Sequence, residues 1–138
     1  MPWHPSFSTD LPDLDAQHQY FVMLLDRLDV ACQLDNGIQL ELGLVELRRY
    51  AAYHFACEES LMDGYGFAGE AHRAAHRTII ARLDEILADP STDHSKICLF
   101  VFEWLTAHIQ RDDFELARHV LSRRKKVLRA MDDLSEVG

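Results

Sequence analysis

LELGLVELRRYAAYHFACEESLMD, the segment from Leu40 to Asp63, repeats its apolar side chains every three or four residues. That period is typical of one face of an α-helix and not of a strand. Two polar residues, His54 and Glu58, take places in the apolar row, and at a spacing of four they lie one turn apart on the same face. The segment therefore predicts a helix that buries a histidine and a carboxylate together with its apolar side chains.

Clusters of turn residues divide the rest of the chain into similar segments. Gly, Pro, Asn and Asp gather at residues 35–37, 64–69 and 89–92, where they favour turns and helix caps. The segments between them keep the helical period, and none alternates as a strand would. We expect four long helices, at about residues 15–34, 40–63, 70–88 and from 93 onward.

Helices of this length joined by short loops pack with antiparallel neighbours. The predicted fold class is therefore all-α: an up-down-up-down antiparallel four-helix bundle with an N-terminal strap and a C-terminal helical tail. The strap, residues 1–14, contains three Pro residues, and we expect it to be extended, with Trp3 and Phe7 folded back onto the bundle. Residues 1–113 are expected to form the bundle domain, and residues 114–138 a C-terminal helical extension.

Composition excludes several classes of function. The chain has 138 residues, a net charge of −9 and 48% hydrophobic residues, which is enough for one domain with a core and too apolar for a disordered tail. The negative charge argues against a nucleic-acid partner, which needs a basic surface. The longest apolar run, Ile97–Phe102, is far shorter than the roughly 20 residues that cross a membrane. Three Cys cannot all pair, and residues 1–15 do not resemble a secretory leader, so we expect a cytoplasmic protein.

Histidines stand in the apolar rows of all four predicted helices. A buried imidazole or carboxylate is costly unless it is hydrogen-bonded, paired or bound to a metal. One such histidine is most simply a satisfied core residue, but five of them with a carboxylate indicate a metal site. Nitrogen and oxygen donors without thiolate suit iron, manganese or zinc, and five imidazoles exceed what one tetrahedral zinc can use. We therefore expect two metals, held by His18, His54, Glu58, His72, His76 and His108.

The fourth predicted helix offers two carboxylates as a further ligand. Asp112 follows His108 by four residues and lies on the same row of the helix. Asp113 follows His108 by five residues and continues the neighbouring apolar row that contains Leu105 and Ile109. Helical geometry alone leaves both carboxylates as candidates.

Four stretches of the sequence resemble the bacterial hemerythrins, which are relatives of the invertebrate oxygen carrier. They are Asp15-Ala16-Gln17-His18, His54-Phe55-Ala56-Cys57-Glu58-Glu59, the pair His72 and His76 with three residues between, and Trp104-Leu105-Thr106-Ala107-His108-Ile109 followed by Asp113. The resemblance covers about residues 3–114, and the full set of motifs is highly specific. It favours Asp113 over Asp112, because the family places its bridging Asp five residues after the histidine.

The resemblance implies a centre of two non-haem iron ions. Five histidines would bind them: His72, His76 and His108 one iron, and His18 and His54 the other, which would keep an open position for O2. Glu58 and Asp113 would bridge the irons, with an oxo or hydroxo group as third bridge. An apolar wall beside the open position would slow autoxidation, and its candidates are Phe21, Val22, Phe55, Trp104 and Leu105. The other histidines, His4, His94 and His119, match no ligand position and are expected at the surface.

Reversible O2 binding, for carriage, storage or delivery, is the function that the resemblance implies. An enzyme is not expected, since the paired Glu-x-x-His motifs of di-iron oxidases are missing from the sequence. The family commonly follows its bridging Asp with Lys-Lys-Tyr, whereas Asp113 is followed by Phe114-Glu115-Leu116 and a tail whose apolar row runs to Leu134. That tail favours an alternative: an O2, redox or nitric oxide sensing domain that signals through a dimer or a downstream domain.

Overall fold

The structure, a computed structural model, describes residues 5–89 and 93–136. Every element in these residues is helical, which confirms the all-α prediction. The elements in chain order are a 3-10 turn η1 (Pro5–Phe7), α1 (Pro12–Gln33), α2 (Gly37–Gly64), α3 (Glu70–Ala88), α4 (His94–His108), a π-helical turn η2 (Ile109–Asp113) and α5 (Phe114–Glu136).

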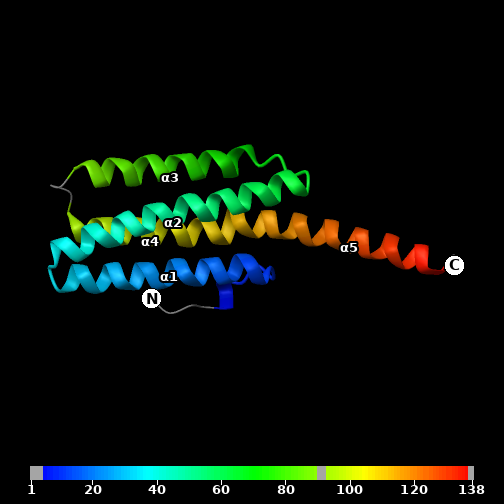
Figure 1. The fold of residues 1–138 in the computed structure, drawn as a ribbon, viewed down its shortest axis with the longest axis horizontal. Coiled ribbons are helices and arrows are strands. Elements are labelled where there is room, and N and C mark those ends of the chain that lie inside the picture. Colours follow the sequence, from blue (N-terminus) through cyan, green and yellow to red (C-terminus); the bar gives the residue numbers. More distant parts are fainter. Residues whose placement is uncertain (1–4, 90–92, 137–138) are drawn as a thin grey trace.

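Helices α1 to α4 lie side by side, each antiparallel to the next in the chain, and form the predicted four-helix bundle (Figure 1). The fourth helix does not end where the bundle ends. It passes through η2 into α5, which projects well beyond the other helices (Figure 1). One continuous helical rod therefore joins the core of the bundle to a solvent-exposed tail.

The start of α1 differs from the prediction of an extended strap. Pro12 is the first residue of α1, a position where proline is well tolerated because its missing N–H would have no helical partner. The backbone N–H and hydroxyl of Thr9 both donate to Asp15 at 2.8 Å, which ties the preceding chain to the first turn of α1. Phe7 is buried in the core, as predicted, whereas Trp3 lies outside the described residues.

The short connection between α1 and α2 is determined by two local features. The side chain of Asn36 caps α2 by accepting a hydrogen bond from the backbone N–H of Gln39 at 3.1 Å. Within α2, a Cβ on Gly43 would lie 2.7 Å from the end of the Leu28 side chain, so a larger residue at this position would displace Leu28. The missing side chain leaves room for the buried Leu28 between α1 and α2.

The core has two apolar clusters with a polar layer between them. The larger cluster joins α1, α2, α3 and α4 through residues such as Phe21, Phe55, Ile79 and Leu105, one from each helix. The smaller cluster packs the start of α1 against the end of α2 and the first two turns of α5, and it consists of Leu11, Leu14, Met62, Leu116, Ala117 and Val120. Along α1, α2 and the fourth helix, buried His and acidic residues fall between the two clusters.

Beyond Arg124, whose guanidinium still contacts the ring and hydroxyl of Tyr65, the tail leaves the bundle. Its apolar side chains there are exposed: Val127, Leu128, Met131 and Leu134 have exposed fractions of 57% to 75%. The helix shows no break at residues 113 and 114, and the division of the chain into residues 1–113 and 114–138 stays a prediction. None of the helices within residues 5–89 and 93–136 is both long and apolar enough to cross a membrane.

Candidate metal centre

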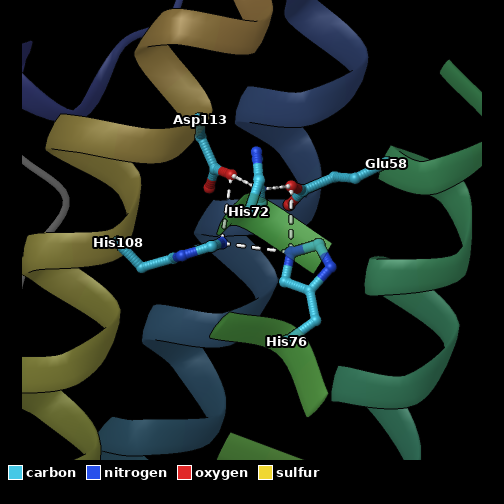
Figure 2. A group of neighbouring side chains, drawn as sticks. All are labelled: Glu58, His72, His76, His108 and Asp113. Carbon is cyan, nitrogen blue, oxygen red and sulfur yellow. Dashed lines mark hydrogen bonds and ion pairs between the residues drawn. The ribbon is translucent and has the colours of Figure 1, made fainter. Parts of the chain in front are cut away.

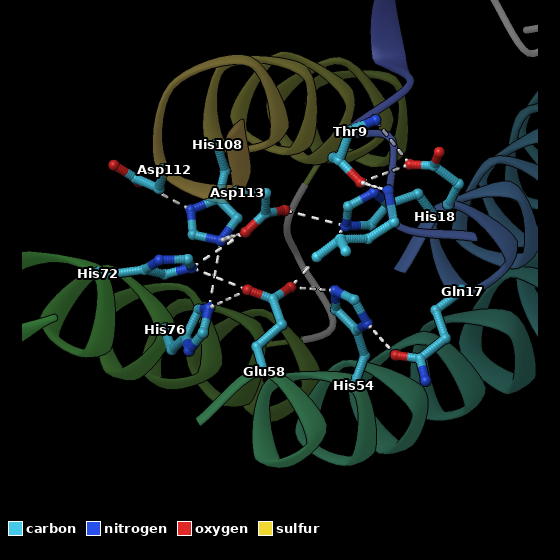
Figure 3. Close-up of polar contacts among 12 residues, drawn as sticks. Thr9, Gln17, His18, His54, Glu58, His72, His76, His108, Asp112 and Asp113 are labelled. Atoms are coloured by element: carbon cyan, nitrogen blue, oxygen red, sulfur yellow. Dashed lines mark hydrogen bonds and ion pairs between the residues drawn. The ribbon is translucent and has the colours of Figure 1, made fainter. Parts of the chain in front are cut away.

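The structure brings all seven predicted ligands together in the polar layer of the bundle (Figures 2 and 3). Each of the four helices contributes to the cluster, and every member is at most 4% exposed. The members are His18 from α1, His54 and Glu58 from α2, His72 and His76 from α3, His108 from α4, and Asp113 from η2. Because these seven side chains are buried away from water, they must either pair with one another or bind a cation.

The π turn η2 explains why Asp113 and not Asp112 joins the cluster. In an α-helix Asp112 would share the face of His108, but residues five apart share a face in a π turn. Oδ1 of Asp113 accordingly lies 3.2 Å from Nε2 of His108. Asp112 instead reaches the outer side of the same imidazole, with Oδ2 2.9 Å from Nδ1 (Figure 3). The family resemblance therefore selected the residue that simple helical geometry did not.

Two groups of donors share the two carboxylates. The first group has five residues, Glu58, Asp113, His72, His76 and His108, and the second has four, Glu58, Asp113, His18 and His54. Within each group one donor atom per residue lies within 4.8 Å of all the others. A metal ion could be held in each group, and the shared carboxylates would lie between the two ions.

Glu58 points one oxygen toward each group. Its Oε2 lies 2.8 Å from Nε2 of His72 and 3.4 Å from Nε2 of His76. Its Oε1 contacts Nε2 of His54 and lies 3.8 Å from Nε2 of His18. The carboxylate is therefore oriented as a bridge between the groups, with one oxygen on each side (Figure 3).

Asp113 divides its oxygens in the same way. Oδ1 lies 3.0 Å from Nε2 of His72 and 3.2 Å from Nε2 of His108, both in the five-residue group. Oδ2 lies 2.9 Å from Nε2 of His18 in the four-residue group. Two carboxylates from different helices thus span the same pair of positions.

Unsatisfied buried atoms show that the cluster fits a cation. Among the described residues, eight buried side-chain nitrogen and oxygen atoms lack a hydrogen-bond partner, and all eight belong to six of these seven residues, His108 being the exception. Both carboxylate oxygens of Asp113 and Nε2 of His18 are among them, although they lie close to one another. Their lone pairs approach a common region without hydrogen-bond geometry, as metal ligands do.

The surrounding histidines keep both carboxylates ionised. Burial opposes the charged form of Glu58, but the imidazoles around it, His54 foremost, hold the pKa of Glu58 well below its usual range. Burial and the negative charge of Glu58 also oppose ionisation of Asp113, yet His108 and the other imidazoles bring the pKa of Asp113 down to about 2. Two negative charges in a buried layer are a strong attraction for a divalent cation.

Protons on the histidines balance those charges when no cation is bound. Burial disfavours the charged imidazole of His18, but the close carboxylates of Asp113 and Glu58 outweigh it and raise the pKa of His18 to about 9. The same balance raises the pKa of His72 to about 9. At His76 burial prevails and the pKa is lowered. A cation entering the cluster would take the place of these protons.

Two polar residues outside the cluster orient its imidazoles. Nδ1 of His54 lies 2.6 Å from the amide oxygen of Gln17, which can only accept, so Nδ1 carries a proton and Nε2 is the nitrogen that faces Glu58. Asp112 fixes His108 in the same tautomer. Helical spacing predicts this role for neither residue. Gln17 gave no periodic signal, because it contacts a histidine of another helix.

Aromatic rings fix the planes of two imidazoles. Phe55 stacks on His76, with ring centroids 4.0 Å apart and an interplanar angle of 10°. Trp104 stacks on His108, with centroids 4.5 Å apart and an angle of 13°. The same two aromatic rings line a small apolar cavity of ≈ 10 Å³ with Phe21 and Leu105. Four of the five predicted wall residues therefore surround one space; Val22 is buried but does not line it.

Of the three histidines expected at the surface, only His119 has a side chain that the structure describes. It is half-buried, and its Nε2 lies 2.7 Å from the carbonyl oxygen of Tyr65, just after the end of α2. The expectation of a surface residue is wrong, because α5 packs against the end of α2 here. His119 joins neither donor group.

Known proteins share both this fold and this sequence pattern. Residues 9–120 match the family model of the hemerythrin HHE cation binding domain. A bacteriohemerythrin of Pseudomonas aeruginosa is 31% identical over 143 residues, covering 99% of this chain and 90% of its own length. One from Methylococcus capsulatus is 26% identical over 119 residues, covering 82% and 91% respectively.

Solved structures agree on the fold. A crystal structure of a hemerythrin point mutant superposes with a TM-score of 0.80 at 23% identity, covering 87% of this chain and 96% of its own. With the near-complete match to bacteriohemerythrins, the family match over residues 9–120 and the buried cluster of His, Glu and Asp, the chain belongs to the hemerythrin family of metal-binding four-helix bundles.

Proposed function

We propose that this protein binds O2 reversibly at a non-haem di-iron centre. One iron would be held by His72, His76 and His108, the other by His18 and His54, with Glu58 and Asp113 bridging them. The observation that carries the proposal is the sharing of both carboxylates by two donor groups, each carboxylate with one oxygen on either side. Ferrous ions held there would supply reversible O2 binding, with an oxo or hydroxo group completing the bridge.

The unequal size of the donor groups supports O2 binding at one position only. The group with His72, His76 and His108 offers five protein donors, and the group with His18 and His54 offers four. Iron prefers a higher coordination number than four, so the smaller group would leave a position for a small ligand. The neutral imidazoles and only two carboxylates would leave a net positive charge on a pair of ferrous ions held there.

The protein surroundings would protect that position from water. Phe21 packs edge-on against His54, with ring centroids 5.1 Å apart, and is 3% exposed. Together with Phe55 and Leu105 it presents an apolar surface that offers water no hydrogen bonds. If water enters slowly, bound O2 would more often leave unchanged than oxidise the iron. This supports a function in O2 binding over an enzymatic one.

Absorption spectroscopy of the reduced, iron-loaded protein tests this function. We expect a visible charge-transfer band to appear when air is admitted and to disappear under argon, through repeated cycles. A His119→Ala variant serves as control, because it removes a half-buried histidine outside both donor groups. A spectrum that does not respond to air, in protein shown to contain iron, would contradict the proposal.

Sensing is a second candidate function, favoured by the continuous helix that joins the cluster to the tail. His108 and Asp113 belong to the same helical rod as the exposed residues Val127 and Leu134. A change in iron or O2 occupancy that shifts this helix would reach the tail directly. A partner bound along the exposed apolar residues, either a second copy or a downstream domain, could respond to that shift.

Limited proteolysis of the oxidised, reduced and O2-bound forms distinguishes the candidates. A sensor predicts that cleavage within α5 changes with the state of the iron, while a carrier predicts the same cleavage in all states. Cleavage in the loop between α1 and α2 serves as an internal control.

As the location of either function we propose the cytoplasm, in agreement with three cysteines that are all free.

A further inference from the structure

Two cysteines lie together at the end of the bundle away from the metal cluster. Cys32 is in the last turn of α1, and Cys98 is in the first half of α4. Both line a cavity of ≈ 380 Å³ between these helices. Cys32 follows His18 by 14 residues, which is about 21 Å along a helix. The pair is therefore separate from the candidate metal centre.

The two thiols contact each other directly. A hydrogen bond joins the side chains of Cys98 and Cys32, and both thiols are free and half-buried. Burial, and next the nearby Cys32, raise the pKa of Cys98 to about 12. Cys98 therefore stays protonated and donates to the sulfur of Cys32, which leaves Cys32 as the sulfur that attacks an oxidant.

We propose that Cys32 and Cys98 form a peroxide-oxidisable dithiol that closes a reversible disulfide between α1 and α4. In the first step the Cys32 thiolate attacks one oxygen of hydrogen peroxide and breaks the O–O bond, giving a sulfenic acid and, after proton transfer, water. In the second step the Cys98 sulfur displaces hydroxide from the Cys32 sulfur, and the proton of the Cys98 thiol passes to that hydroxide to give the second water. The net change oxidises two thiols to a disulfide and reduces one peroxide to two waters.

The charges around the cavity favour a small neutral oxidant. Asp26 and Asp29 line it beside the two sulfurs, and the charge of Asp29 contributes to the raised pKa of Cys98. Carboxylates in the cavity lining disfavour anionic disulfides of the glutathione type, whereas hydrogen peroxide carries no charge. Both cysteines line this cavity, whose volume of ≈ 380 Å³ is large enough to hold such a molecule.

The third cysteine provides a matched control. Cys57 is also half-buried and lies within a helix, but its side chain hydrogen-bonds the hydroxyl of Tyr53 and no second thiol. The same oxidant can therefore modify Cys57 without forming a disulfide within the chain. Any crosslink that depends on proximity should contain Cys32 and Cys98 alone.

Peptide mapping under non-reducing conditions tests the proposal on the full-length, iron-loaded protein. Stoichiometric hydrogen peroxide should lower the number of free thiols from three to one, join the Cys32 and Cys98 peptides, and be reversed by dithiothreitol. Cys57→Ser should form the same crosslink. Cys98→Ser should form none and stop at a sulfenic acid on Cys32 that dimedone traps. The crosslinked protein should also unfold at a higher temperature, because the bond closes a long loop.

Three outcomes would overturn the proposal: a disulfide that contains Cys57, crosslinks only between chains, or over-oxidised Cys32 without a bond to Cys98. The wild-type map decides the question even if Cys98→Ser does not fold. Iron content measured before and after treatment separates this chemistry from damage at the metal centre. The result does not depend on whether the irons bind O2.

Discussion

The two halves of the candidate metal centre share both carboxylates but differ in the number of their donors, in the helices that supply their histidines and in the outer partners of those histidines. The five-donor half takes its histidines from α3 and α4, and the four-donor half takes them from α1 and α2. A carboxylate, Asp112, supports an imidazole of the first half, whereas an amide, Gln17, supports one of the second. The sharing holds two metals together, and the inequality would determine which of them has room for a ligand.

The outer partners reinforce this inequality. A carboxylate that accepts from Nδ1 makes the imidazole a stronger donor than an amide does, since it stabilises positive charge on the ring. His108 would therefore bind its metal more strongly than His54 binds the other. We expect the five-donor half to retain metal under conditions that empty the four-donor half. Four sets of variants test this comparison.

Removal of a shared carboxylate should have the largest effect. Glu58→Gln keeps the shape of the side chain but removes the negative charge and one metal-binding oxygen from both halves. We expect iron content to fall from about two ions per chain to nearly none, because metal affinity depends on ionised ligands. Glu41→Gln is the matched control, because its carboxylate is on the same helix but is exposed. Equal iron content in both variants would contradict a bridging role for Glu58.

Loss of one histidine should affect the two halves differently. His54→Ala reduces the four-donor half to three donors, so we expect about one iron per chain and no absorption change with air. His76→Ala reduces the other half to four donors and should retain more iron. Elemental analysis of both variants, with circular dichroism to check folding, measures the difference. If His76→Ala loses more iron than His54→Ala, the inequality between the halves is wrong.

Outer-partner variants should cause smaller losses. Asp112→Asn and Gln17→Ala each leave all seven candidate ligands in place, and substitutions at such positions typically weaken metal affinity about 10- to 100-fold. Competition with a chelator measures the release of each iron, and Asp133→Asn, an exposed carboxylate of α5, is the control. We expect Asp112→Asn to speed release from the five-donor half and Gln17→Ala from the other. Release at the control rate in both variants would show that neither residue supports a ligand.

A core substitution away from the cluster should leave iron content unchanged. Leu28 is 1% exposed in the larger apolar cluster, so Leu28→Ala should lower the free energy of unfolding by about 2–5 kcal/mol. Leu34→Ala, at a position that is 72% exposed, should change it by less than about 0.5 kcal/mol. Chemical denaturation measures both. A loss of iron from folded Leu28→Ala would mean that packing at the far end of the bundle also sets the geometry of the centre.

Most of the bundle could be predicted because its period is local. Turn residues and helical spacing predicted the third helix at residues 70–88, as the structure has it, and the second to within three residues. The first helix begins at Pro12, three residues before the predicted start, because this proline occupies the first turn of the helix and not the chain that precedes it. Proline at a helix start and proline in an extended strap look the same in a sequence, so only the packing of the chain decides.

The cluster could be predicted as a group, but its details could not. Buried histidines on four apolar rows imply convergence wherever the helices form one bundle. The π turn at Ile109–Asp113 escapes any argument based on a period of 3.6, and the choice of Asp113 came from the family pattern. Gln17 escaped because its partner is on another helix. The role of each of the seven residues as a metal ligand stays a prediction.

The number of irons that one chain binds tests the central claim most directly. Metal-free protein is titrated with ferrous iron without oxygen, excess metal is removed, and bound iron is quantified against protein concentration. The two donor groups with shared carboxylates predict saturation at about two irons per chain. Saturation at one iron, or purified protein that holds a single zinc and takes up no iron, would contradict a di-iron centre.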